Sequence, residues 1–127
     1  DEIIRLVADM LKRLTRPGDL FGRFGGEEFL FVLVDTDEND VRAYAERIRS
    51  EIARRGEIMK ARFHDLDLTV SIGVTLYQPN FKSYADMIEA ADQAMYRAKT
   101  SGRNRVVLFN EIPPGTPYAA SRRRHED

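Results

Sequence analysis

Two adjacent glutamates, Glu27 and Glu28, directly follow two glycines, Gly25 and Gly26. Carboxylate oxygens are the ligands that Mg²⁺ and Mn²⁺ prefer, and a bound dication would offset the repulsion between neighbouring carboxylates. Glycines would also let a triphosphate approach the backbone closely. The other interpretation is a solvated turn that carries two surface acids. The spacing alone leaves both interpretations open.

Two cationic side chains further along the chain are suited to binding phosphate. Lys99 and Arg103 are four residues apart, so they share one face if a helix continues that far. Ammonium and guanidinium groups donate charge-assisted hydrogen bonds to phosphate oxygens. The alternative is an ordinary cationic helix C-terminus, which the helix dipole favours.

A third candidate is the segment Arg16-Pro17-Gly18-Asp19. An arginine fork can bind a phosphate or a guanine edge, and an aspartate can accept hydrogen bonds from guanine N–H groups. The alternative is a turn that ends a helix, because Pro17 keeps Arg16 out of the α region and Gly18 suits a type II turn.

Composition excludes several classes of protein. The chain has 127 residues, 43% of them hydrophobic, which fits one domain with a single core. Its net charge of -1 gives no general attraction to DNA, RNA or an anionic membrane. The absence of cysteine excludes disulfides, thiolate metal sites and a cysteine nucleophile, and the isolated His64 and His125 do not favour a zinc site. Any metal is therefore expected to be a hard cation held by carboxylates.

The longest apolar run, 29–34, is too short to span a membrane, and no signal peptide opens the chain. We therefore expect a soluble, cytoplasmic domain without direct membrane contact. The expected location includes the cytoplasmic part of a membrane-anchored parent.

Apolar spacing predicts a helix of about fourteen residues, a β-hairpin, a helix that ends at Gly56, a half-buried strand, a helix that ends at Gly102 and a last strand. The hairpin strands are 20–24 and 29–34, the half-buried strand is 66–77, and the last strand is 105–109. This order predicts an α+β, ferredoxin-like domain over 1–110 with a mostly antiparallel sheet, followed by a flexible tail over 111–127.

The segment Phe24-Gly25-Gly26-Glu27-Glu28-Phe29 resembles the signature hairpin of the GGDEF family of diguanylate cyclases, in its GGEEF form. Three other segments agree with the family in order and spacing, so the resemblance covers about residues 1–109. These segments are Arg16-Pro17-Gly18-Asp19, Ser71-Ile72-Gly73-Val74, and Ala91 to Lys99 leading into Gly102-Arg103-Asn104-Arg105.

The resemblance implies a nucleotide-cyclase palm-like fold and an activity. The family condenses two GTP molecules into cyclic di-GMP and two pyrophosphates, with two domains facing each other in a homodimer. It implies Mg²⁺ or Mn²⁺ as the cofactor. Glu27 would be a metal ligand and candidate general base, and Glu28 would complete or support the metal site. Gly25, Gly26, Lys99 and Arg103 would bind the substrate, the last two at its β- and γ-phosphates.

The resemblance also implies product feedback. Arg16 and Asp19 match the family's RxxD inhibitory site for cyclic di-GMP, and Arg47 lies where the family often offers another arginine to that product. Asp92, Tyr96 and Asn104 match the family motif but are interpreted as structural. Ser71 and Gly73 are interpreted as packing positions beside the site.

The family's domain begins with a strand that carries another metal-binding Asp, followed by a helix that reads guanine, and this chain starts after both. We therefore expect a fragment that is inactive alone, from a bacterial signalling parent with an upstream sensory or receiver module. The gap left by the interior strand could be filled by an omitted segment, by a neighbouring copy, or by rearrangement of the sheet.

Two other functions stay open. One is a non-catalytic GGDEF module that binds cyclic di-GMP or regulates an attached phosphodiesterase. The other is a purine-nucleotide cyclase, against which the Lys99 and Arg103 motif argues. The intact pair Glu27 and Glu28 favours the diguanylate cyclase, because a pure sensor does not need both acids.

Overall fold

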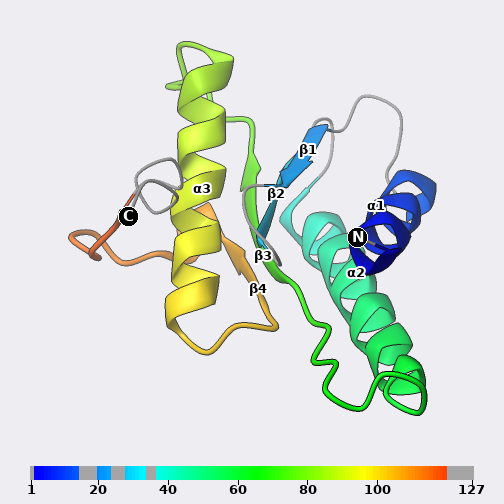
Figure 1. The fold of residues 1–127 in the computed structure, drawn as a ribbon. Helices are drawn as coiled ribbons and strands as arrows, with labels where there is room; N and C mark the ends of the chain where they lie inside the picture. The colour runs from blue at the N-terminus through cyan, green and yellow to red at the C-terminus, as the bar shows by residue number, and fades with distance from the viewer. Residues whose placement is uncertain (1, 15–19, 24–27, 34–36, 120–127) are drawn as a thin grey trace.

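A computed structural model describes residues 2–14, 20–23, 28–33 and 37–119 (Figure 1). The hairpin and the three predicted helices are present. The elements in chain order are α1 (Glu2–Leu14), β1 (Leu20–Arg23), β2 (Glu28–Leu33), α2 (Glu38–Met59), β3 (Ser71–Leu76), α3 (Tyr84–Thr100), β4 (Val106–Leu108) and the 3₁₀ turn η1 (Phe109–Glu111).

The strands form one sheet in the order β1-β2-β3-β4. The predicted hairpin is confirmed, because β1 and β2 are antiparallel. The expectation of a mostly antiparallel sheet is wrong, because β2 with β3 and β3 with β4 pair in parallel. Each of these two pairs is joined through a helix, which returns the chain to the edge where the previous strand began.

Strands β2 and β3 pair directly along their whole lengths, from Glu28 opposite Ser71 to Leu33 opposite Leu76. No strand lies between them.

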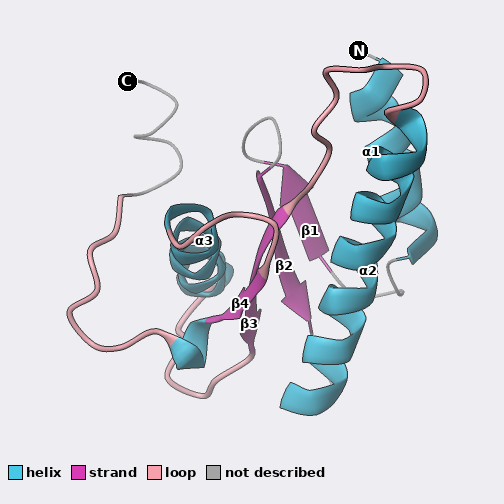
Figure 2. Cartoon of the chain, turned by 90° about the horizontal axis from the view of Figure 1, so that it is seen from below, coloured by secondary structure: helices cyan, strands magenta, loops and turns pink. Residues whose placement is uncertain are grey.

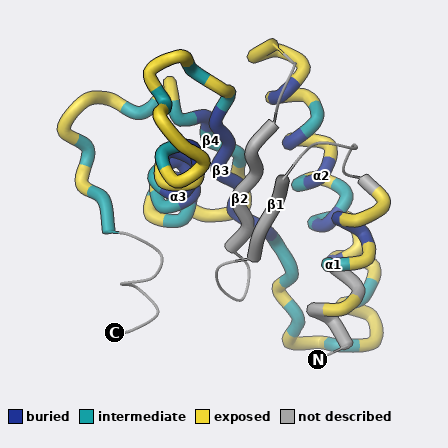
Figure 3. Tube along the Cα trace, turned by 90° about the horizontal axis from the view of Figure 1, so that it is seen from above, coloured by how far each residue is buried: buried dark blue, intermediate teal, exposed yellow. Residues whose placement is uncertain are grey.

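Helices cover both faces of the sheet: α3 lies on one face, and α1 and α2 lie on the other (Figure 2). The core lies mainly between α2 and the sheet, and α1 adds Met10 and Leu11 to it. The buried apolar side chains of that core are Met10, Leu11, Val41, Ala45, Ile48, Ile52, Val70, Ile72, Val74 and Leu108. Figure 3 shows that the buried positions of α2 recur along one side of the helix.

Strand β3 is buried on both faces, whereas its alternating sequence predicted one buried face. Ile72 and Val74 belong to the core beside α2. A Cβ atom added at Gly73 would lie only 2.1 Å from the backbone nitrogen of Met95, so α3 packs directly on the backbone of β3. The strand also starts at Ser71 rather than at residue 66.

Helix α2 extends to Met59, so the prediction that it ends at Gly56 is wrong. Asp37 caps its start by accepting a 2.9 Å hydrogen bond from the backbone nitrogen of Asp40. Gly56 is buried inside the helix, and a Cβ atom there would lie 2.7 Å from the carbonyl oxygen of Leu68. Gly56 therefore allows the backbone at Leu68 to pack closely against α2, and it does not terminate the helix.

The predicted end of α3 at Gly102 is confirmed, and side chains cap its start. The Ser83 hydroxyl accepts a hydrogen bond from the backbone nitrogen of Asp86, and the Asp86 carboxylate accepts one of 2.7 Å from the backbone nitrogen of Lys82. Gly102 follows the helix with a φ of 133°, a conformation that favours glycine.

The segment after η1 returns to α3. The Tyr118 hydroxyl donates a hydrogen bond to the carboxylate of Asp92, and its ring meets Tyr96 edge-on at 5.9 Å between centroids. Tyr118 therefore contacts the domain, while 120–127 lie outside the described residues. The division into a domain over 1–110 and a tail stays a prediction. Among the described residues, no helix is long and apolar enough to cross a membrane.

Candidate nucleotide site

The predicted metal-binding hairpin is described only in part. Gly25, Gly26 and Glu27 lie outside the described residues. Glu28 is the first residue of β2, so it belongs to the strand rather than to the turn, and it pairs with Ser71 at the start of β3. Ser71 is 1% exposed, and its hydroxyl has no hydrogen-bond partner among the described residues.

Lys99 and Arg103 do not share a helix face, because α3 ends at Thr100. Lys99 lies in the last turn of the helix and is half-buried, whereas Arg103 follows the helix and is exposed. The backbone nitrogen of Arg103 donates a 2.9 Å hydrogen bond to the carbonyl oxygen of Ala98, which folds the chain back over the helix end. The turn, rather than helical periodicity, places the second cation.

The turn after α3 has three successive residues with positive φ: Gly102 at 133°, Arg103 at 62° and Asn104 at 44°. Such values are uncommon for residues other than glycine. The Arg105 side chain donates a 3.1 Å hydrogen bond from Nε to the carbonyl oxygen of Arg103. From α2, Arg49 donates a 2.7 Å hydrogen bond from Nη1 to the amide oxygen of Asn104.

Arg49 is the residue near this site that sequence reasoning missed. It donates from Nε to both carboxylate oxygens of Glu46 at 2.9 Å, one helical turn away. This hydrogen bonding lowers the pKa of Glu46 and raises the pKa of Arg49. In sequence the pair indicates only a solvated helix face, and no local signal predicts a contact with Asn104, 55 residues away.

The register of the parallel strands places the hairpin end and this turn at one edge of the sheet. Glu28 is opposite Ser71, and the next residue, Ile72, is opposite Val106 and bonds the carbonyl oxygen of Arg105. Neighbouring strands are about 4.8 Å apart, so the start of β2 and the start of β4 are separated by about 10 Å. The edge thus combines an acidic position with the turn that carries Arg103.

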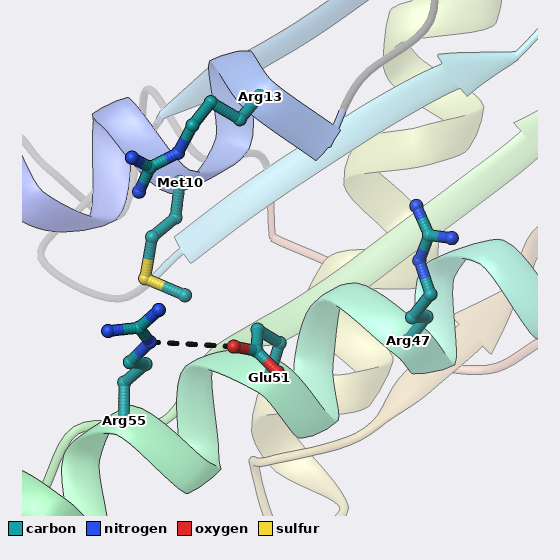
Figure 4. A pocket seen from close by; sticks show the side chains of 5 residues that line it. All are labelled: Met10, Arg13, Arg47, Glu51 and Arg55. Carbon is teal, nitrogen blue, oxygen red and sulfur yellow. Dashed lines mark hydrogen bonds and ion pairs between the residues drawn. The ribbon is translucent and has the colours of Figure 1, made fainter.

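The third candidate, Arg16 and Asp19, lies outside the described residues. Its proposed helper Arg47 is exposed on α2 and lines a groove of about 260 Å³ between α1 and α2 (Figure 4). Arg13 and Met10 line it from α1, and Glu51 and Arg55 line it from α2.

The groove carries three guanidinium groups and one carboxylate. Arg55 pairs with Glu51 at 3.4 Å, and Arg54, which does not line the groove, pairs with the same carboxylate at 2.6 Å. Arg13 and Arg47 have no ion pair with another described residue. This excess of positive charge suits an anionic ligand. Helix α1 ends at Leu14, two residues before Arg16.

The residues at the hairpin fit a hard divalent cation by the chemistry of their donors. Glu27 and Glu28 supply carboxylate oxygens, and the buried Ser71 hydroxyl beside Glu28 in register is a further oxygen without a partner among the described residues. No group of three or more histidine, cysteine, aspartate or glutamate side chains that could hold a metal occurs within the described ranges.

Comparison with known proteins identifies the class of domain. The profile of the family "Diguanylate cyclase, GGDEF domain" matches residues 1–105. The chain belongs to the GGDEF family of diguanylate cyclase domains.

Among curated relatives, Diguanylate cyclase A of Treponema denticola is 37% identical over 114 residues, covering 89% of this chain and 30% of that protein. Diguanylate cyclase DosC of Escherichia coli is 38% identical over 109 residues, covering 86% of this chain and 23% of that protein. The chain therefore spans less than a third of either relative.

Solved structures confirm the predicted palm-like GGDEF fold. The GGDEF domain of DgcB from Caulobacter crescentus, solved in complex with c-di-GMP, has a TM-score of 0.66 and 31% identity, covering 86% of this chain and 64% of that chain. The active GGEEF domain of a diguanylate cyclase from Vibrio cholerae also has a TM-score of 0.66, with 27% identity, covering 86% of this chain and 67% of that chain.

Proposed function

We propose that this chain is part of a cytoplasmic diguanylate cyclase that condenses two GTP molecules into cyclic di-GMP. The observation that carries the proposal is that the Glu28 end of β2 and the start of β4, which directly follows the Arg103 turn, lie at one edge of the sheet, with the two strand starts about 10 Å apart. That separation suits a nucleotide whose metal-bound phosphates extend from the carboxylates toward the cations.

In the proposed reaction, the ribose 3′ hydroxyl of one GTP attacks the α-phosphorus of the other. The new O–P bond replaces the bond to the β-phosphate, and pyrophosphate leaves. Glu27 accepts the proton of the attacking hydroxyl, and a second, equivalent step between the facing domains of a homodimer closes the ring.

The chain's residues would bind and orient the substrate. Glu27 and Glu28 would hold Mg²⁺ or Mn²⁺, which neutralises phosphate charge when bound. Gly25 and Gly26 would admit the triphosphate close to the backbone, and Lys99 and Arg103 would bind its β- and γ-phosphates.

Glu27→Gln in the protein that carries this domain tests the chemical step. We expect GTP turnover, followed by pyrophosphate release with Mg²⁺ or Mn²⁺, to fall by about 100-fold or more, because the variant loses both the base and a charged ligand. Glu57→Gln is the matched control, since Glu57 is an exposed glutamate on α2 that pairs with Lys60 and should leave turnover unchanged. Wild-type turnover in Glu27→Gln would refute the mechanism.

We further propose that the product binds at Arg16, Asp19 and Arg47 and inhibits the enzyme. The cationic groove beside Arg47 and the end of α1 supports this proposal. The related DgcB domain was solved in complex with c-di-GMP. A dinucleotide with two phosphates would be bound by arginine forks, with Asp19 accepting hydrogen bonds from guanine.

Calorimetry with cyclic di-GMP tests the product site. Arg16→Ala and Arg47→Gln should each weaken binding by about tenfold or more and relieve product inhibition. Arg54→Gln on the outer side of α2 should bind like the wild type. Unchanged inhibition in Arg16→Ala would exclude this site. Tight product binding together with no GTP turnover in the wild-type protein would instead favour the non-catalytic module.

A further inference from the structure

We propose that Arg49 of α2 is a positioning residue for Arg103. Through the side chain of Asn104, its guanidinium holds the turn after α3 in the backbone conformation that directs Arg103 toward the phosphates of GTP. The inference rests on the proposed function, because it assumes that Arg103 binds phosphate.

The backbone of the turn needs external support. Arg103 and Asn104 both have positive φ, at 62° and 44°, and no glycine occupies either position. L-residues other than glycine reach this region at a steric cost, and asparagine tolerates it better than arginine does. A left-handed pair of this kind persists only where surrounding interactions determine it.

Arg49 supplies such an interaction from a different element. Its Nη1 reaches the Asn104 amide oxygen at 2.7 Å, joining α2 to a turn that lies 55 residues further along the chain. The Arg49 side chain is only 19% exposed, and Glu46 holds the other edge of the guanidinium with both carboxylate oxygens. The ion pair with Glu46 therefore orients the Arg49 guanidinium toward the turn.

Two local hydrogen bonds also restrain the backbone of Arg103. Its backbone nitrogen bonds the carbonyl oxygen of Ala98, and its carbonyl oxygen accepts from Arg105 Nε. Both bonds restrain the backbone of Arg103 itself, whereas Arg49 restrains the residue that follows. Without the Arg49 bond, Asn104 can leave the left-handed region and carry the Arg103 side chain with it. A substrate phosphate would then have to order the turn as it binds.

The expected effect is on substrate affinity. In the protein that carries this domain, Arg49→Gln should raise the KM for GTP and the Kd for a non-hydrolysable GTP analogue by about tenfold, with kcat changed less than twofold. Arg54→Gln is the matched control, because Arg54 forms the same type of i, i+3 ion pair, with Glu51. Equal KM values in Arg49→Gln and Arg54→Gln would overturn the proposal.

Asn104→Gly separates positioning from a general loss of stability. Glycine keeps the backbone freedom of the turn but removes the acceptor for Arg49, so this variant should raise KM as Arg49→Gln does. The double variant should be no worse than either single variant, because both remove the same contact. Additive effects of the two substitutions on KM would contradict the proposal. A lower urea midpoint of unfolding with an unchanged affinity for the GTP analogue would also contradict it.

Arg103→Ala distinguishes failure of this inference from failure of the proposed function. If Arg103→Ala leaves the affinity for the GTP analogue unchanged, the proposed phosphate role of Arg103 is wrong. If Arg103→Ala weakens binding but Arg49→Gln does not, only the positioning role is wrong. In the Arg103→Ala background, Arg49→Gln should have no further effect.

Discussion

At the residue scale, Asp92 is the one buried charged side chain among the described residues, at 5% exposure. Its motif predicted a structural role, and the contact with Tyr118 agrees with such a role. The partner could not be predicted, because Tyr118 lies in a proline-rich segment whose composition indicates a tail. Burial of a carboxylate is tolerated where hydrogen bonds replace its hydration.

Tyr118→Phe tests the importance of this contact. Removing the hydroxyl deletes a hydrogen bond to a buried carboxylate, so we expect the free energy of unfolding to fall by about 2 kcal/mol in urea titrations. Tyr84→Phe is the control: Tyr84 is 65% exposed, and its variant should change stability by less than about 0.5 kcal/mol. Equal stability of the two variants would show that Tyr118 does not anchor the segment.

At the element scale, the packing of α3 on β3 fixes the position of the candidate site. The small residue Gly73 lets the backbone of the helix approach that of the strand, and α3 then ends in the turn that carries Arg103. Sequence periodicity predicted both elements. It did not predict that the polar face of β3 is covered, since that face consists of Ser71, Gly73 and Thr75 and has no apolar signal.

Gly73→Ala should therefore disrupt the fold. The added Cβ atom would lie 2.1 Å from the Met95 nitrogen and 2.3 Å from the Ala91 carbonyl oxygen, and neither backbone atom can move alone. We expect a loss of about 3 kcal/mol or more in the free energy of unfolding. Gly115→Ala is the control. The φ of Gly115 is 82°, and an added Cβ atom there would meet nothing within 4 Å, so the free energy of unfolding should fall by only about 1 kcal/mol. Similar losses would mean that the contact relaxes easily.

At the scale of the whole molecule, tertiary folding gathers cations that are far apart in the chain. Arg13 belongs to α1, whereas Arg47 and Arg55 belong to α2, and all three line one groove (Figure 4). The net charge of -1 for the whole chain conceals this local excess. An anionic ligand therefore meets a positive field that composition does not indicate.

Arg55→Gln tests whether the groove acts as a unit. Its guanidinium lines the groove beside Arg13, so the variant should weaken binding of cyclic di-GMP by about threefold to tenfold in calorimetry, with a stronger effect at low salt. Arg54→Gln removes an equal charge from the same carboxylate partner outside the groove and should have little effect. If both variants weaken binding equally, the general charge of α2, and not the groove, is responsible.

The sequence by itself determined most of the local structure and named the candidate residues for the chemistry. The candidate acids and cations, the hairpin and the end of α3 at Gly102 follow from residue types and short local patterns, because side-chain chemistry and turn preferences act over a few residues. The tertiary structure alone decided the parallel pairing of β2 with β3 and the passage of Leu68 over Gly56. It also decided the bond from Arg49 to Asn104. These features depend on which distant surfaces pack together, and local sequence does not encode that choice.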